Sequence, residues 1–156
     1  MNKPLIVRPA VESDVDAICG LLAEYAAKKL LLKRDREDVL GKLKNFRVGT
    51  VDGEFACCVA LRDFGDDLYE VRSLAVREQF NNLGYGSRLV AGAVEPLRDL
   101  GRPVRVFALT YRAAFFCRLG FQVVSKDMFP QKIWSDCAVC PRKDCCDETA
   151  VLLEIG

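Results

Sequence analysis

The chain has 156 residues, of which 51% are hydrophobic and 29% charged, enough to bury one globular core. Its 23 Lys and Arg residues balance 22 Asp and Glu residues, and the formal net charge of +1 excludes an extended basic surface for nucleic acid or an anionic membrane. The absence of His excludes Ser-His-Asp triads, Cys-His dyads and HExxH metal sites, so acid or base chemistry must use carboxylates, Tyr, thiols or backbone groups.

The sequence lacks the patterns of secretion and membrane insertion. The apolar stretch at residues 5–7 is too short for a signal peptide, and no run of about 18 apolar residues occurs. We therefore expect a cytoplasmic protein whose eight cysteines are reduced. Because no repeat, low-complexity tract or linker divides the chain, residues 1–156 are expected to form one domain, with an irregular, Cys-rich segment at 126–149.

The first half of the chain predicts one strand, two helices and a three-stranded antiparallel meander. Residues 5–8 are rich in β-formers, and Ser13 is expected to cap a helix whose apolar side chains recur at helical spacing through Tyr25. A second helical pattern ends near Asn45. Three strands, separated by turn signals at Asp52-Gly53 and Gly65-Asp66-Asp67, are then expected at 46–51, 54–64 and 68–76.

In the second half, strand and helix patterns alternate, which indicates the α/β class. A helix is expected over 84–100, with Pro96 bending its last turn. Residues 104–109 are nearly all apolar, as expected for a strand buried on both faces. The remaining expected elements are a short helix at 113–119 and strands at 121–124 and 150–155.

The junction 71–89 (VRSLAVREQFNNLGYGSRL) joins an apolar strand to a helix through a glycine-containing loop. Such a junction exposes backbone N–H groups and the positive end of the helix dipole, which together suit a pyrophosphate. The alternative is that Gly84 and Gly86 only permit close packing of the helix. The loop lacks the Lys-Ser/Thr of a P-loop, which disfavours nucleotide hydrolysis.

Strand 68–76 carries two charged side chains in an otherwise apolar sequence. If side chains alternate regularly, Glu70, Arg72 and Leu74 share one face. Two charges in a central strand require a cleft, in which Glu70 is a candidate general base for an amine. The alternative is a mutual Glu70–Arg72 ion pair on a solvated face.

Two spaced motifs resemble those of the GNAT acetyltransferases. Leu74-Ala75-Val76 followed by Asn81-Asn82-Leu83-Gly84-Tyr85-Gly86 is similar to the acetyl-CoA signature, usually Arg/Gln-Gly-x-Gly-x-Gly/Ala, and residues 115–121 (FFCRLGF) resemble the second motif, a short helix ending in Gly-Phe. The element order also matches, so the resemblance covers nearly the whole chain. It implies the GNAT acyl-CoA N-acyltransferase fold, with a mixed central sheet flanked by helices, and acetyl-CoA as co-substrate.

The resemblance assigns an acetyl-CoA site and shows where this chain departs from the family. Asn81 stands where Arg or Gln is usual, so that Arg77 or Arg88 would supply charge near the phosphates, and Asn82 replaces a Gly whose left-handed backbone Asn tolerates. Phe116 occupies the position of the Tyr that protonates the departing thiolate in many relatives, which leaves the general acid unassigned. The implied acetyl-CoA residues are Leu74, Ala75, Val76, Asn81, Asn82, Leu83, Gly84, Tyr85, Gly86, Ser87, Phe115, Phe116 and Arg118.

A closer resemblance is to the short stand-alone N-acetylglutamate synthases of bacterial arginine biosynthesis. It is carried by Tyr25 with 31–34 (LLKR), by 68–76 (LYEVRSLAV), 107–110 (FALT) and 130–134 (PQKIW). The resemblance implies acetyl transfer to the α-amino group of L-glutamate, whose carboxylates would be held by Lys33, Arg34, Arg72 and Lys132. Arg112, directly after strand 104–109, either joins this set or is a surface arginine.

The expected reaction is direct attack of the amine on the thioester. Glu70 stands in the Glu-x-x-x-x-Ala-Val spacing of the base used by histone-acetylating GNAT enzymes, which makes it the base implied here. The N–H of Leu74 or Val76 would donate to the developing oxyanion, and the pantetheine amides would pair with the same strand edge. We therefore name Glu70 and Leu74 as catalytic residues.

Several alternatives remain at the sequence level. The acceptor is either glutamate or another amino acid, a polyamine or a protein amine, and Asn81, Asn82 and Phe116 also fit a non-catalytic acyl-CoA-binding module. No nucleic-acid or membrane partner is expected, and a homodimer is one option for the oligomeric state.

The cysteine-rich tail has three readings. Cys137, Cys140, Cys145 and Cys146, with Asp147 as a further ligand, suit a structural zinc, but they lack the His or second CxxC pair of the usual pattern. The other readings are reduced loop cysteines, which we favour, and a pair that oxidises, so no metal site is assigned.

Overall fold

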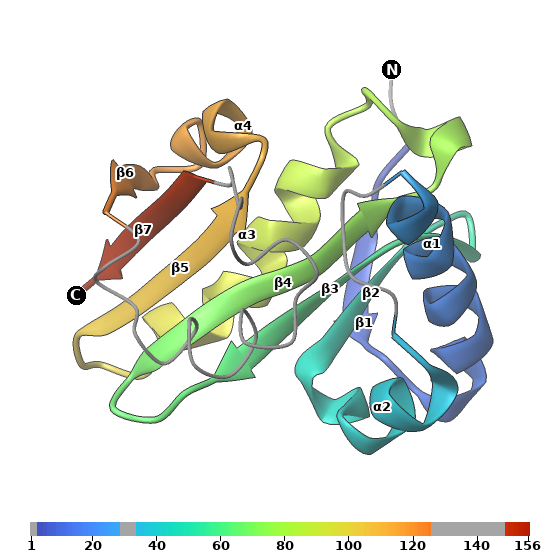
Figure 1. Ribbon diagram of the computed structural model, residues 1–156, viewed down its shortest axis with the longest axis horizontal. Helices are drawn as coiled ribbons and strands as arrows, with labels where there is room; N and C mark the ends of the chain where they lie inside the picture. The colour runs from blue at the N-terminus through green and yellow to red at the C-terminus, as the bar shows by residue number, and fades with distance from the viewer. Residues whose placement is uncertain (1–2, 29–33, 126–148) are drawn as a thin grey trace. The chain divides into compact units, whose positions relative to one another are not determined.

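The computed structural model describes residues 3–28, 34–125 and 149–156 (Figure 1). Lys33, Lys132 and the cysteines from 137 to 146 lie outside these residues, so nothing is established about their predicted roles. The chain divides into two compact units, the first comprising 1–62 and 71–101 and the second 63–70 and 102–156. The division falls inside strand β4 (Leu68–Val76), which contributes residues to both units.

The strands follow the order β1-β2-β3-β4-β5-β7-β6 in a seven-stranded mixed sheet. Leu68, Tyr69 and Glu70 of β4 pair in parallel with β5, whereas β1–β2, β2–β3, β5–β7 and β6–β7 are antiparallel. The remaining strands are β1 (Ile6–Pro9), β2 (Phe46–Val51), β3 (Glu54–Asp63), β5 (Val104–Thr110), β6 (Gln122–Val124) and β7 (Thr149–Ile155). The helices are η1 (Glu12–Asp14), α1 (Val15–Ala27), α2 (Arg36–Gly41), η2 (Leu43–Asn45), η3 (Glu78–Phe80), α3 (Tyr85–Arg98) and α4 (Ala113–Cys117).

The predicted α/β class and element order are confirmed, and most boundaries agree to within two residues. The hairpin between β2 and β3 shows why: Asp52 and Gly53 have φ angles of 52° and 77°, the left-handed pair that a tight hairpin turn requires. The helix predicted over 84–100 extends over Tyr85–Arg98 and contains Pro96. Arg105 is exposed, so β5 is less completely buried than its apolar sequence predicts.

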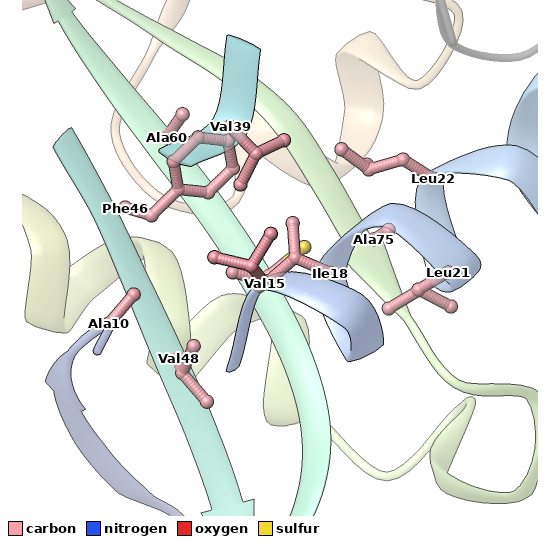
Figure 2. Close-up of a cluster of buried hydrophobic side chains, with 11 residues drawn as sticks. Ala10, Val15, Ile18, Leu21, Leu22, Val39, Phe46, Val48, Ala60 and Ala75 are labelled. Carbon is pink, nitrogen blue, oxygen red and sulfur yellow. The ribbon is translucent and has the colours of Figure 1, made fainter. Parts of the chain in front are cut away.

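In the first unit, helices cover both faces of the β1–β2–β3 strands. On one face, Ile18 and Leu22 of α1 pack with Phe46 of β2 (Figure 2). Full burial of such a side chain contributes about 1.5–3 kcal/mol of stability. Cys58 of β3 belongs to the same cluster. On the other face, α3 packs on β1 and β2, and Gly92 provides the close approach, because a Cβ there would lie 3.1 Å from Val7.

Adjacent cysteines of β3 face these two layers separately. Cys58 belongs to the cluster beneath α1, whereas the sulfur of Cys57 lies against Gly49 of β2, where an added Cβ would be only 2.6 Å away. Burial raises the pKa of the Cys57 thiol to about 12, and burial also raises the pKa of Cys58. Both thiols therefore stay protonated and act as small hydrophobic side chains.

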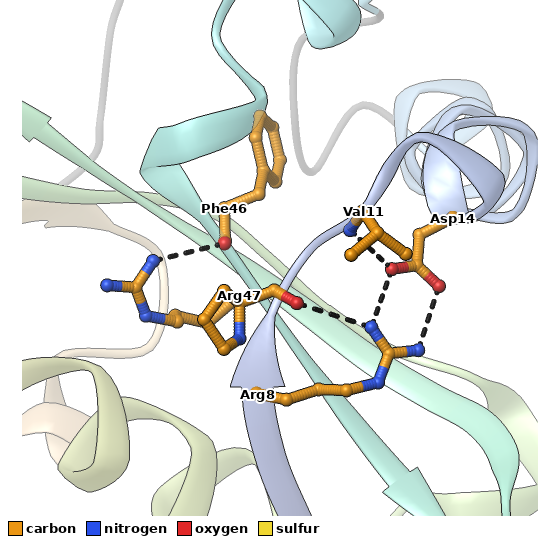
Figure 3. A network of polar contacts seen from close by, with 6 residues as sticks. Arg8, Val11, Asp14, Phe46 and Arg47 are labelled. Atoms are coloured by element: carbon orange, nitrogen blue, oxygen red, sulfur yellow. Dashed lines mark hydrogen bonds and ion pairs between the residues drawn. The ribbon is translucent and has the colours of Figure 1, made fainter.

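The start of α1 corrects one prediction. Ser13 does not cap the helix: the N-cap position is Asp14. The Asp14 carboxylate accepts hydrogen bonds from the Val11 N–H (2.8 Å) and from the Arg8 guanidinium of β1 (Figure 3). These contacts tie the first turn of the helix to the preceding strand, and a tertiary partner for Asp14 cannot be read from local sequence.

The second unit is built around β5 and β7. Phe107 of β5 packs with Leu68 of β4 and with Leu152 of β7, while α4 packs on β6 and β7. Arg102 donates to Asp67 (2.8 Å), and the Arg105 N–H donates to the Asp67 carbonyl (2.9 Å), which fixes the entry into β5. Among the described residues, no helix is both long and apolar enough to cross a membrane.

Candidate active site

Strand β4 contains one residue with unusual backbone, Ser73, whose φ of 55° lies in the left-handed region that L-residues other than Asn, Asp and Gly seldom adopt. Regular alternation of side chains requires extended backbone on both sides of a residue. The burial pattern does not follow simple alternation along the whole of β4: Glu70, which is 2% exposed, and the adjacent Val71 are both buried, and buried and partly buried residues alternate only from Val71 to Val76. Glu70 therefore differs in burial from Arg72 and Leu74, which were predicted to share its face.

Side chains from two other elements hold Ser73. The Arg34 Nη1 donates to Ser73 Oγ (3.3 Å), and the Cys58 thiol donates to the Ser73 carbonyl (3.6 Å). Non-glycine backbone in this region costs on the order of 1–3 kcal/mol and persists only where the surroundings fix it. Arg34 and Cys58 provide that fixation from the α1–α2 connection and from β3.

Arg34, a predicted carboxylate ligand, is a buried cation with a defined orientation. It is 8% exposed, and its carbon Cζ lies 5.1 Å from the ring centroid of Phe46. Its Nε donates to Asp38 Oδ2 at 2.7 Å, and this hydrogen bond, opposed by desolvation, holds the pKa of Asp38 below its ordinary value. Contacts at Nε and Nη1 fix the plane of the guanidinium beside β4, as binding of a planar carboxylate requires.

The end of β4 is joined to α1 through one hydroxyl. The Tyr25 Oη accepts a hydrogen bond from the Val76 N–H (3.1 Å) and donates one to the Val76 carbonyl (3.0 Å). Of the two predicted oxyanion donors, Val76 N–H thus already has an acceptor in this structure.

The loop from β4 to α3 has the geometry of an anion cradle. Asn82 adopts the left-handed backbone predicted for it, with φ of 62°, and Gly84 follows with φ of 84° at the N-cap position. No side chain caps the helix at Gly84, so N–H groups of its first turn, which have no acceptor inside the helix, face the loop together with the positive end of the dipole. The residues present therefore suit the pyrophosphate of a nucleotide-containing co-substrate.

Two arginines near this loop, Arg77 and Arg88, differ in the groups that they contact. Arg77 donates to the Phe55 carbonyl (3.0 Å) and to Glu54 Oε1 (3.3 Å), which directs its guanidinium to β3. Arg88 lies over the ring of Tyr85, with Cζ 5.8 Å from the centroid. Tyr85 itself is buried and donates to the Lys3 carbonyl, so its role is to anchor α3. Of the two arginines predicted to supply charge near the phosphates, Arg77 is thus bound to β3, whereas Arg88 is exposed on α3.

The other predicted site residues belong to the second unit. Glu70 pairs with Phe107 in the parallel ladder and is almost fully buried. Phe116 is also buried and makes edge-to-face contacts with Phe115 and Phe121, which gives it a packing role within α4. Exposed side chains from this region are Arg112, whose Cζ lies 5.4 Å from the Phe115 ring centroid, and Arg118.

The contacts that four residues of the first unit make around β4 were not predicted from the sequence. These residues are Tyr25, Asp38, Cys58 and Ser73. Tyr25 fits the apolar helical repeat, Cys58 the buried strand pattern, and Ser73 an ordinary strand position. Only Asp38 carries a local signal, since it stands four positions after Arg34 at the start of a helix, the spacing of a helical ion pair.

Comparison with known proteins identifies related sequences. The protein-family model described as Acetyltransferase (GNAT) family matches residues 21–121. An uncharacterized N-acetyltransferase of Chlorobaculum tepidum is 39% identical over 146 residues, which is 94% of each chain. The amino-acid acetyltransferase of Neisseria meningitidis is 34% identical over 80% of this chain, and that of Mycobacterium tuberculosis 35% identical over 74%. This chain spans only 29% of the Neisseria protein and 67% of the mycobacterial one.

Solved structures show the same similarity. N-acetylglutamate synthase from Neisseria gonorrhoeae, complexed with coenzyme A and N-acetyl-glutamate, matches 100% of this chain with a TM-score of 0.85 and 28% identity, over 36% of its own length. A Mycobacterium tuberculosis protein in complex with CoA matches 97% of this chain and 99% of its own, with a TM-score of 0.80 and 30% identity.

Proposed function

Since the chain belongs to the GNAT acetyltransferase family and uses acetyl-CoA as its acetyl donor, we propose that it acetylates the α-amino group of L-glutamate. The observation that carries the proposal is the buried, oriented guanidinium of Arg34 beside β4. An amino dicarboxylate needs about two cationic partners if both its carboxylates leave water. The gonococcal synthase with CoA and N-acetyl-glutamate supports this acceptor.

In the proposed reaction, acetyl-CoA supplies a thioester that is already activated, so the protein contributes a base, a hydrogen-bond donor and positioning. Glu70 accepts the proton of the substrate ammonium, directly or through one water. The Leu74 N–H donates to the oxygen that becomes negative as the amine attacks. The C–S bond then breaks, coenzyme A leaves as its thiolate, and the remaining excess proton of the nitrogen passes to that thiolate or to solvent. The α3 N-terminus and the Asn81–Ser87 loop hold the phosphates, with Leu74–Val76, Phe115, Phe116 and Arg118 along the remainder of the co-substrate.

The proposed carboxylate ligands begin with Arg34 and include Arg72, which is partly buried in β4 next to Ser73. Lys33, Lys132 and the exposed Arg112 complete the set that the resemblance implies. We propose arginine biosynthesis, which the resemblance implies, as the pathway. The complex of the gonococcal enzyme with CoA and L-arginine supports a link of that protein to arginine.

A different acceptor is the second candidate function. The Chlorobaculum relative matches nearly the full length of this chain, and its name specifies an N-acetyltransferase without an acceptor. Another amino acid, a polyamine or a protein amine would retain the base and the co-substrate site. A polyamine, or an amino acid with a single carboxylate, would not require two cationic partners such as Arg34 and Arg72.

The test is mass spectrometry of the products formed from acetyl-CoA and an equimolar mixture of amino acids and polyamines. We expect a single new product, N-acetylglutamate, and its loss when glutamate is omitted. Another acetylated product would retain the enzyme class and reject glutamate as the acceptor. Tight acetyl-CoA binding with no product from any acceptor would contradict the proposal and favour an acyl-CoA-binding module.

A further inference from the structure

The last peptide groups of β4 point to the edge opposite β3. The Arg77 N–H donates to the Ala56 carbonyl of β3 (2.8 Å). Neighbouring residues of an extended chain direct their N–H and C=O groups to opposite edges, so those of Val76 point away from β3. At that edge they meet the hydroxyl of Tyr25 from α1, at 3.1 Å from the nitrogen and 3.0 Å from the oxygen. In Figure 1, the end of β4 accordingly lies beside α1.

The Tyr25 hydroxyl thus makes the two hydrogen bonds with Val76 that a residue on a neighbouring antiparallel strand would make. In a hydrogen-bonded antiparallel pair, each residue exchanges both its N–H and its C=O with the residue opposite. Tyr25 reproduces this exchange through a single oxygen, which accepts from one group and donates to the other. The Val76 position of the edge is therefore occupied by a side chain of the protein itself.

A ligand that lies along this edge as an added strand needs the same two groups of Val76. The pantetheine arm of acetyl-CoA carries amide N–H and C=O groups and suits that mode of binding. The Val76 N–H has a single hydrogen, so it cannot serve the phenol oxygen and a ligand carbonyl with full strength at the same time. Binding of the arm at Val76 requires the Tyr25 hydroxyl to move away.

We propose that Tyr25 is a further residue of the acetyl-CoA site, whose hydroxyl occupies the Val76 peptide in the ligand-free enzyme and is displaced when the pantetheine arm binds. This inference rests on the proposed use of the β4 edge for acetyl-CoA. The hydroxyl keeps the edge hydrogen-bonded until the co-substrate arrives. Its removal therefore strengthens acetyl-CoA binding, because the ligand no longer competes with it.

The experiment compares acetyl-CoA affinity, by isothermal titration calorimetry, in the wild-type chain and in Tyr25→Phe. Two lost competing hydrogen bonds predict a Kd about threefold to tenfold lower in the variant. Tyr69→Phe is the matched control, because Tyr69 is a partly buried tyrosine of β4, the strand that contains Val76, and has no assigned role. Its Kd should equal that of the wild type. An unchanged or weaker affinity in a cooperatively folded Tyr25→Phe protein would overturn the inference.

A second measurement uses the wild-type chain and so does not depend on the folding of Tyr25→Phe. The sequence contains four tyrosines, so that tyrosine labelled at Cζ gives four NMR signals, and that of Tyr25 is assigned by elimination from the other three Tyr→Phe variants. Saturation with CoA should shift the Tyr25 signal as its hydroxyl loses both partners. A signal that stays in place at saturation overturns the inference while leaving acetyl transfer intact. Failure of the wild-type chain to bind CoA would overturn both proposals.

Discussion

Arg8 and Asp14 form a two-point ion pair, with Nη1 to Oδ2 at 2.7 Å and Nη2 to Oδ1 at 2.9 Å (Figure 3). The Asp14 carboxylate also accepts a hydrogen bond from the Val11 N–H. Replacement of Asp14 by Asn therefore leaves Arg8 and the Val11 N–H without an anionic partner at the start of α1. We expect Asp14→Asn to lower the free energy of unfolding by about 1–2 kcal/mol, a value reduced for solvent screening because the Arg8 side chain is 37% exposed. Urea unfolding at pH 7 measures this loss.

The difference in unfolding free energy between the wild type and Asp14→Asn should disappear at low pH. The hydrogen bond from Arg8 lowers the pKa of Asp14 in the folded state, so the stabilisation is complete above the unfolded pKa of about 3.9 and is lost as the pH falls through the lower, folded value. Unfolding curves of wild type and Asp14→Asn should therefore converge toward low pH. Asp16→Asn, at an exposed carboxylate that pairs with Arg36, should change little at any pH. A constant gap between the Asp14 variant and the wild type across the titration would contradict this assignment.

Glu70→Gln tests the base. The variant retains the shape of a side chain that is 2% exposed but cannot accept a proton at neutral pH. We expect kcat to fall by about 10²-fold to 10⁴-fold, with acetyl-CoA affinity unchanged. Steady-state assay at saturating acetyl-CoA measures the change. Turnover equal to that of the wild type would remove Glu70 from the reaction.

Arg34→Lys tests the acceptor site. Lysine retains the positive charge but cannot donate to Asp38 and Ser73 in the planar geometry of the guanidinium. We expect the KM for glutamate to rise about tenfold or more, while the KM for acetyl-CoA stays the same. Arg36→Lys, at a largely exposed arginine of α2, is the control and should leave both constants unchanged. An equal rise in both constants for Arg34→Lys would indicate a general distortion and not a carboxylate site.

Gly84→Ala tests the anion cradle. At φ of 84°, a Cβ costs about 1–2 kcal/mol of backbone strain although it would meet no atom within 4 Å. We expect weaker acetyl-CoA binding together with lower stability. Gly20→Ala, in the interior of α1 and also without a steric contact, should stabilise the protein by about 0.5–1 kcal/mol and leave binding unchanged. Calorimetric titration and thermal unfolding of both variants separate the two effects, and unaltered affinity in Gly84→Ala would count against the cradle.

Local chemistry accounts for what the sequence predicts well. The Asp52-Gly53 turn, the strand–loop–helix junction at Gly84 and the left-handed Asn82 all depend on residues within a few positions of one another. The family motifs lie in the same local segments. Their spacing was therefore sufficient to predict the fold and the class of reaction.

Contacts between distant segments account for what the sequence does not predict. The left-handed backbone of Ser73 depends on Arg34 and Cys58, and the occupied Val76 peptide depends on Tyr25. Each pair is separated by at least 15 positions in the chain. The periodic spacing of apolar residues does not predict such contacts, because each of these side chains alone also suits an ordinary helix or strand.

The left-handed residue in β4 also limits how this chain can be recombined with its relatives. Buried and partly buried residues alternate from Val71 to Val76, with Ser73 in the left-handed region, so one inserted or deleted residue in this part of β4 would exchange inward and outward positions up to Val76. Chimaeras that join two parents inside 68–76 retain this pattern only if both parents place the left-handed residue at the same position. Crossovers at the Asp52-Gly53 turn avoid the problem, which makes that hairpin the better junction for chimaeras between acetyltransferases.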